Sequence, residues 1–119
     1  MNYFLVFIGG GIGSTLRYAF GQLQVKYLTT TFPIATLLAN LLATAILGAV
    51  LYWIMPKFQG STWLNPLLIA GFCGGFSTFS TFSNDTVQLV QSGSYYLAVL
   101  NVSISLLLGL LLVFLFSKS

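Results

Sequence analysis

Long apolar stretches follow one another along the chain, and short polar or proline-containing segments separate them. Four such stretches lie at about residues 3–20, 33–54, 65–90 and 95–116. A helix needs about 20 apolar residues to cross the hydrocarbon core of a bilayer, and each stretch is near that length. The pattern predicts an all-α integral membrane protein with four transmembrane helices, in which residues 1–119 form a single four-span domain.

The third stretch differs from the others in its middle. The paired glycines Gly74 and Gly75 are followed by the run FSTFSTFSND, in which Ser and Thr alternate with Phe. This composition favours a break in the helix, and non-helical backbone at membrane depth is tolerated only where protein or a water-filled cavity surrounds it. We therefore predict a broken third helix. Freed carbonyls at such a break can hold a cation without a carboxylate.

Composition excludes most soluble and catalytic classes. The chain is 57% hydrophobic and 4% charged, with a mean hydropathy of +0.96, whereas about a quarter of the residues in soluble domains are charged. With no His, one Cys and one acidic side chain, it cannot build a catalytic triad, a carboxylate pair or a His/Cys metal cage. The scattered basic residues make no nucleic-acid footprint. We predict a protein that is not an enzyme and binds no nucleic acid.

The four basic residues are divided evenly between the two ends of the predicted bundle. Arg17 and Lys26 lie towards the first and third loops, and Lys57 and Lys118 lie towards the second loop and the C-terminus. Orientation in the membrane follows an excess of Lys and Arg on one side, and this chain has no such excess. We predict that both orientations occur and that the chain forms an antiparallel, dual-topology homodimer, with the two-fold axis in the membrane plane.

Small and polar residues recur every four positions on three of the predicted helices. Such a stripe allows two backbones to approach closely, or it lines a polar path. For Asn40 both interpretations stay open, because its amide can join helices or face a path. The positions are Gly9 and Gly13 in the first helix, Thr36, Asn40, Thr44 and Gly48 in the second, and Asn101, Ser105 and Gly109 in the fourth.

Phe79 and Phe82 are three residues apart, so they share one helix face beside the predicted break, interleaved with Ser80 and Thr81. The edge of a phenyl ring carries a partial positive charge. Ring edges turned towards a path could therefore coordinate a small anion less tightly than a Lys would. A single Phe is usually a packing residue, and it is the alternation with hydroxyls beside a break that indicates a site here.

Three motifs together resemble those of the Fluc (CrcB) family of bacterial fluoride channels. They are GGxG at residues 10–13 with Arg17-Tyr18, TLxxN at residues 36–40, and GFCGGF at residues 71–76 followed by TFSTFS at residues 78–83. The resemblance covers nearly the whole chain, and the third motif is long enough to be specific. It implies a dual-topology homodimer with two antiparallel pores. Such a protein passively exports fluoride across the bacterial cytoplasmic (inner) membrane and reduces its toxicity.

The resemblance also implies the residues of the fluoride pore. Asn40 would coordinate the anion through its amide donors. Phe79 and Phe82 would supply ring edges, one from each subunit in a given pore. Ser80 and Thr81 would act as hydroxyl donors on the exit track.

A second group of residues is implied outside the pore centre. Backbone carbonyls of Gly74 and Ser77 would hold a structural sodium ion (Na+) between the subunits. Arg17 would lie near the pore entrance, although a snorkelling interfacial anchor fits it equally well. Ser105 would belong to the outer part of the polar track.

Three departures from the family pattern lie at or close to these positions. Ser77 stands where the family usually has Thr, which matters little for a ligand that is a carbonyl. Asp85 stands where Glu is common, and we expect it to be structural and to pair with Arg17. Asn101 stands in the fourth helix where some members have Tyr, a change that bears on the outer polar track.

Two other function classes are compatible with four apolar helices. A small multidrug-type transporter exchanges protons through a carboxylate in its first span, and the first stretch of this chain contains none. A non-transporting membrane assembly protein would need only glycine faces, but it gives no account of the hydroxyl-rich, broken third stretch.

Overall fold

The computed structural model describes residues 2–119, and each predicted apolar stretch corresponds to helix in it. No strand occurs among these residues, so the predicted all-α class is confirmed for them. The elements are α1 (Asn2–Tyr27), α2 (Ile34–Ala49), a π-helical turn (Val50–Ile54), a 3-10 turn (Met55–Lys57), a π-helical segment (Asn65–Cys73), α3 (Gly74–Phe76), α4 (Phe79–Gln91) and α5 (Tyr95–Lys118).

Within the described part of the chain, three helices are long and apolar enough to cross a membrane, namely Asn2–Tyr27, Ile34–Lys57 and Tyr95–Lys118. Large apolar side chains stand on their outer faces, including Tyr3, which is 93% exposed, and Leu110, which is 70% exposed. Apolar surface of this extent needs lipid or another protein to cover it. The structure therefore agrees with the prediction of a multi-pass membrane protein.

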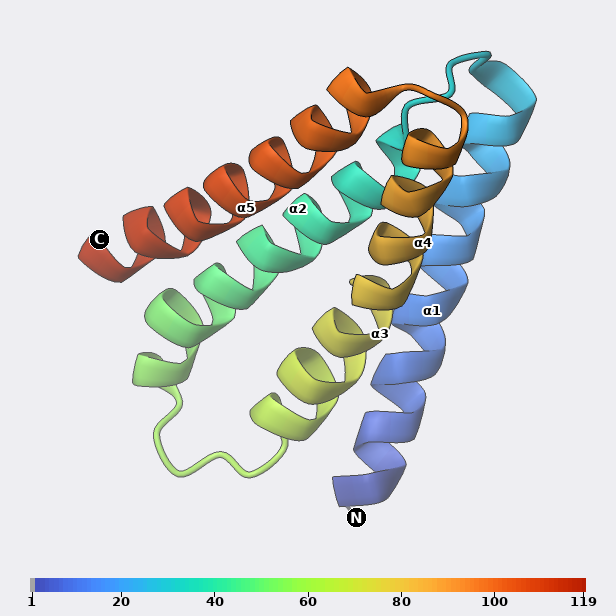
Figure 1. Cartoon of the computed structure of the whole chain (residues 1–119). Coiled ribbons are helices and arrows are strands. Elements are labelled where there is room, and N and C mark those ends of the chain that lie inside the picture. Colours follow the sequence, from blue (N-terminus) through green and yellow to red (C-terminus); the bar gives the residue numbers. More distant parts are fainter. Residues whose placement is uncertain (1) are drawn as a thin grey trace.

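The third stretch lies between α1 and α2 and is divided into two halves. Figure 1 shows the half at residues 65–76 running along α1, and α4 continuing from it at an angle. α5 turns back from the end of α4 and lies alongside α2 (Figure 1). The break is therefore enclosed by α1 on one side and by α2 on the other.

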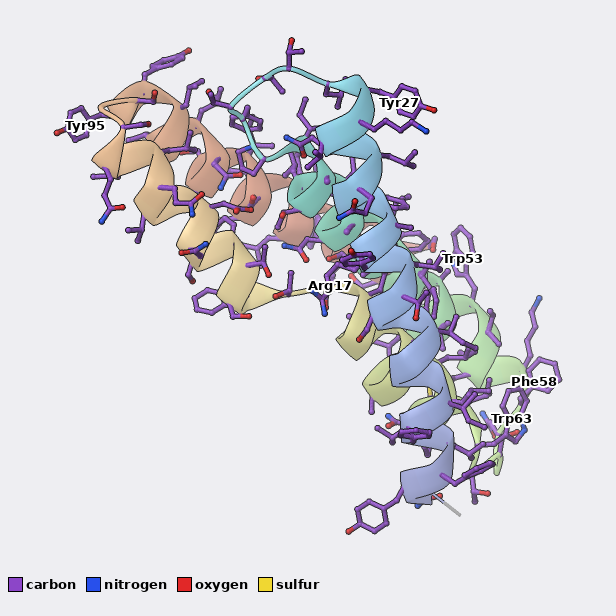
Figure 2. All side chains as sticks on the ribbon, turned by 90° about the vertical axis from the view of Figure 1, so that its right-hand side faces the viewer. Arg17, Tyr27, Trp53, Phe58, Trp63 and Tyr95 are labelled. Atoms are coloured by element: carbon purple, nitrogen blue, oxygen red, sulfur yellow. The ribbon has the colours of Figure 1, made fainter. Side chains whose placement is uncertain are left out.

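Aromatic side chains gather towards both ends of this arrangement. Figure 2 shows Tyr27 and Tyr95 at one end, and Phe58 and Trp63 at the other. Tyr and Trp favour the two membrane–water interfaces, because their rings are apolar while their O–H and N–H groups are polar. Their placement fits a bundle that spans a bilayer along its long direction.

Glycines let α1 and the half-helix at residues 65–76 approach backbone to backbone. A Cβ added at Gly75 would lie 2.6 Å from the carbonyl oxygen of Gly10, and one added at Gly13 would lie 2.7 Å from the backbone nitrogen of Phe76. These distances are too short for any side chain. The glycine face of α1 is thus confirmed as a close-packing surface.

The replacement Gly75→Ala should destabilise the protein, because its methyl group would push against backbone that cannot move aside. We expect a loss of roughly 1–3 kcal/mol of unfolding free energy, measured by thermal or denaturant unfolding in detergent. Gly21→Ala is the matched control, since a Cβ there meets nothing within 4 Å among the described atoms. Equal stability of the two variants would contradict this account of the packing.

Candidate functional site

The break in the third stretch lies between Phe76 and Phe79. Ser77 (φ −83°, ψ 158°) and Thr78 (φ −154°, ψ 126°) are extended, whereas Gly74 and Gly75 are still helical. Thr78 begins the next helix, because its side chain accepts a hydrogen bond from the backbone N–H of Thr81 at 3.1 Å. The predicted break is therefore confirmed, and it follows the glycine pair rather than falling on it.

Asn40 on α2 holds the open backbone at this break. Its Nδ2 donates to the carbonyl oxygen of Thr78 at 3.1 Å, and the backbone N–H of Thr78 donates to Asn40 Oδ1 at 2.7 Å. The amide thus satisfies both polar groups of one peptide residue that has left the helix. An Asn amide has two N–H donors, so this pair uses one of them. Asn40 therefore joins α2 to the broken third stretch, which agrees with the interpretation that its amide joins helices.

The same interactions release two backbone carbonyls from helical hydrogen bonding. In a continuous helix the N–H of Thr78 would bond to the carbonyl of Gly74, and the N–H of Thr81 would bond to the carbonyl of Ser77. Here the first N–H goes to Asn40 and the second goes to the Thr78 hydroxyl. The two carbonyls implied as sodium ligands are therefore among those that the break frees.

Gly74 also lies open on the outside of the half-helix. A Cβ added there would meet only the carbonyl oxygen of Ile69, at 3.7 Å, among the described atoms. Packing within this chain therefore gives no reason for a glycine at this position. Carbonyl oxygens suit a hard cation such as sodium, so the donor chemistry and the open surface both fit the ion.

Arg17 reaches the end of the first half-helix from α1. Its Nε donates to the carbonyl oxygen of Gly75 at 3.1 Å, where a cation complements the partial negative charge of a helix C-terminus. Figure 2 shows Arg17 beside the point where the broken stretch passes from α3 to α4. It also lines a hollow of about 190 Å3 with Thr36 and Thr81.

The expected pairing of Asp85 with Arg17 is wrong. Within residues 2–119 the Asp85 carboxylate instead accepts a hydrogen bond from Thr36 Oγ1, at 2.8 Å. The reason is geometric: Arg17 is held at the break by Gly75, while Asp85 lies further along α4, facing α2. Asp85 therefore has a hydroxyl partner in place of a cation.

The phenyl rings of Phe79 and Phe82 are neighbours at the start of α4. Their centroids are 5.9 Å apart and their planes are inclined by 40°. Phe79 is 80% exposed, and Phe82 is half-buried. The break therefore presents two adjacent rings, and the described residues leave the ring of Phe79 largely uncovered.

Hydroxyl groups lie next to these rings. Thr78 Oγ1 and Ser80 Oγ are within 3.2 Å of each other, and Thr81 lines two adjoining hollows. Ser105 is separate from this cluster, because it lies on α5. Its Oγ is buried and has no hydrogen-bond partner among the described residues.

The larger hollow, of about 560 Å3, opens between α1, α2 and α4, and the polar side chains in its lining include Thr36, Thr81, Asp85 and Gln88. It shares Thr36 and Thr81 with the smaller hollow beside Arg17. Together they form a polar vestibule that leads from the α1–α2 loop towards the start of α4. Sequence reasoning did not find this vestibule, because its walls come from three separate helices.

Gln24 was also missed. Its Oε1 accepts from the backbone N–H of Ala35 at 2.7 Å, and its Nε2 donates to the carbonyl oxygen of Phe32 at 2.8 Å. It thus caps the start of α2 from α1 and fixes the loop at the vestibule mouth. A Gln in the last turn of α1, just before the loop that leads to α2, was the signal that could have found it.

Comparison with known proteins places this site in a family. The protein-family model described as "CrcB-like protein, Camphor Resistance (CrcB)" matches residues 4–116. The "Fluoride-specific ion channel FluC" of Flavobacterium psychrophilum is 41% identical over 108 residues, which cover 91% of this chain and 87% of the relative. The protein of that name from Coxiella burnetii is 38% identical over 109 residues (91% and 88%). The one from Shewanella frigidimarina is 40% identical over 114 residues (96% and 91%). This chain therefore belongs to the CrcB family.

Proposed function

We propose that this chain is a fluoride-selective ion channel that passively exports fluoride across the bacterial cytoplasmic membrane and so reduces its toxicity. The proposal is carried by the helix break, where neutral donors and the rings of Phe79 and Phe82 gather at the end of a polar vestibule. Relatives that match over most of the chain are named fluoride-specific ion channels. The family is thus one of channels and not of enzymes.

Fluoride is small and strongly hydrated, so a selective path must replace its water shell with other donors. The path must also lack any site so deep that it traps the ion. The hydroxyls of Ser80 and Thr81, the second N–H of Asn40 and the ring edges of the Phe pair are all neutral. They would compensate for lost water without the strong attraction of a free ammonium group.

The vestibule supports one direction for the proposed path. Fluoride would enter beside the α1–α2 loop, pass Thr36 and Thr81, and reach the two phenyl rings. The Thr36 hydroxyl holds the Asp85 carboxylate, and Arg17 adds a positive charge at the inner end of the vestibule. Ser105 would continue the path as an outer donor, since its buried hydroxyl has no partner among the described residues.

The functional unit would be an antiparallel homodimer with two pores and a central structural sodium ion. The exposed ring of Phe79 and the open position at Gly74 support a protein partner at the break. The freed carbonyls of Gly74 and Ser77 would hold the ion, whose positive charge would link the two chains. The even division of Lys and Arg supports insertion in both orientations.

The first test is fluoride flux from liposomes that contain the purified protein, followed with a fluoride electrode and compared with chloride flux. Phe82→Ile keeps an apolar side chain but removes the ring edge, whose electrostatic interaction in aromatic pairs is about 0.5–1.5 kcal/mol. We therefore expect fluoride flux to fall by about tenfold. Phe114→Ile, on the exposed face of α5, is the matched control and should conduct normally. Wild-type flux no greater than that of empty liposomes would exclude the channel and favour a multidrug-type transporter or an assembly protein.

The second test concerns the dimer and its ion. Gly74→Ala should leave the single chain stable, because there is room for the methyl group and Ala favours helix. We expect it to weaken dimerisation, seen as a shift towards monomer in size-exclusion chromatography. Replacing sodium with N-methylglucamine should produce the same shift in the wild type. Gly21→Ala, which faces the vestibule, is the control. A Gly74→Ala dimer as stable as the wild type would argue against contact at this surface.

The third test concerns orientation. A Ser119→Cys variant in a Cys73→Ala background carries one thiol, at the C-terminus. A membrane-impermeant maleimide applied to intact cells should label about half of the molecules if both orientations insert equally. Labelling of all or none of them would mean a single orientation.

A further inference from the structure

We propose that Asn101 on α5 is a positioning residue for Phe82 and acts through Thr86, rather than a residue that binds fluoride itself. The inference deepens the proposed function, since Phe82 matters only if the phenyl pair lines the fluoride path. It concerns this chain's own departure from the family pattern, in which some members have Tyr at this position.

The three residues form a directed chain of hydrogen bonds. Asn101 Nδ2 donates to Thr86 Oγ1 at 3.0 Å, and Thr86 Oγ1 donates to the carbonyl oxygen of Phe82 at 2.8 Å. A Thr hydroxyl has a single proton, so giving it to Phe82 leaves the oxygen free to accept from Asn101. Each bond therefore polarises and strengthens the other.

Because Asn101 is buried, its amide needs a hydrogen-bond partner within the protein. Asn101 is the one polar side chain that is fully buried in the described part of the protein, at 1% exposure. A buried amide without a partner costs about 1–3 kcal/mol, so the contact with Thr86 is not an incidental one. It fixes the distance and the angle between α4 and α5 at this level.

The position of Thr86 explains why Phe82 is affected. α4 has only 13 residues and starts at the break, where Asn40 holds Thr78. Thr86 is a second fixed point about two turns further on, so together the two amides set the rotation of α4 about its own axis. Phe82 lies between them, on the same helix face as Thr86 and the buried Leu89.

Asn101 and Ser105 thus divide the polar stripe of α5 into two roles. They are one turn apart on the same face, but the Asn101 amide is committed to Thr86. The buried Ser105 hydroxyl has no partner within residues 2–119. Asn101 spends one of its two amide donors on Thr86, whereas the single donor of Ser105 is unpaired among the described residues.

The test uses Thr86→Val, Asn101→Leu, the double variant and Thr86→Ser, all in the full-length protein. Thr86→Val should reduce fluoride flux by about tenfold, the size expected for one lost hydrogen bond, and should also lower stability because Asn101 is left unpaired. In the double variant no polar group is left unpaired, so stability should return while flux stays about tenfold low. Thr86→Ser keeps the hydroxyl and should conduct within about twofold of the wild type.

A second readout does not depend on conduction. With 4-fluorophenylalanine at position 82, the fluorine NMR resonance should shift or broaden in Thr86→Val and in the double variant, but not in Thr86→Ser. An unchanged resonance in the double variant would overturn the inference even if the wild type conducted no fluoride. So would full recovery of flux in the double variant. If Asn101→Leu abolished flux while Thr86→Val conducted normally, Asn101 would lie on the path itself. That result would also overturn the inference.

Discussion

The reciprocal hydrogen-bonded pair between the Asn40 amide and the backbone of Thr78 is the interaction on which the site depends. A break in a membrane helix exposes N–H and C=O groups, each of which costs several kcal/mol in hydrocarbon if it stays unsatisfied. One amide on α2 removes that penalty for the residue at the centre of the break. Because Thr78 is held, α4 can start at Phe79, and the Gly74 and Ser77 carbonyls are left free for another ligand.

The low charge of the chain means that the groups around the helix break are mostly neutral. Hydrogen bonding around the break uses amides, hydroxyls and backbone groups, and Arg17, the one cation that reaches it from residues 2–119, is bound to the Gly75 carbonyl. Neutral groups bind an anion moderately, whereas a free ammonium in a low-dielectric interior would hold it strongly. A path built in this way can remove water from fluoride and still release the ion.

The sequence predicted what depends on local composition and did not predict what depends on contact between helices. The four apolar stretches and the break followed from hydropathy and from the glycine and hydroxyl run. The position of the break did not, because Asn40 selects it from another helix. Pairing Asp85 with Arg17 relied on opposite charge alone, whereas hydrogen bonds to Thr36 and to a helix end decide their partners.

The two adjacent glycines before the break show why one motif can serve two surfaces. Successive residues of a helix point about 100° apart, so Gly74 and Gly75 face different surroundings. Gly75 meets the backbone of Gly10 in the same chain, whereas Gly74 faces open space. Close packing within this chain explains the glycine at position 75 but gives no reason for the glycine at position 74. A backbone that approaches from another subunit, as in a two-fold contact within the membrane plane, would supply that reason.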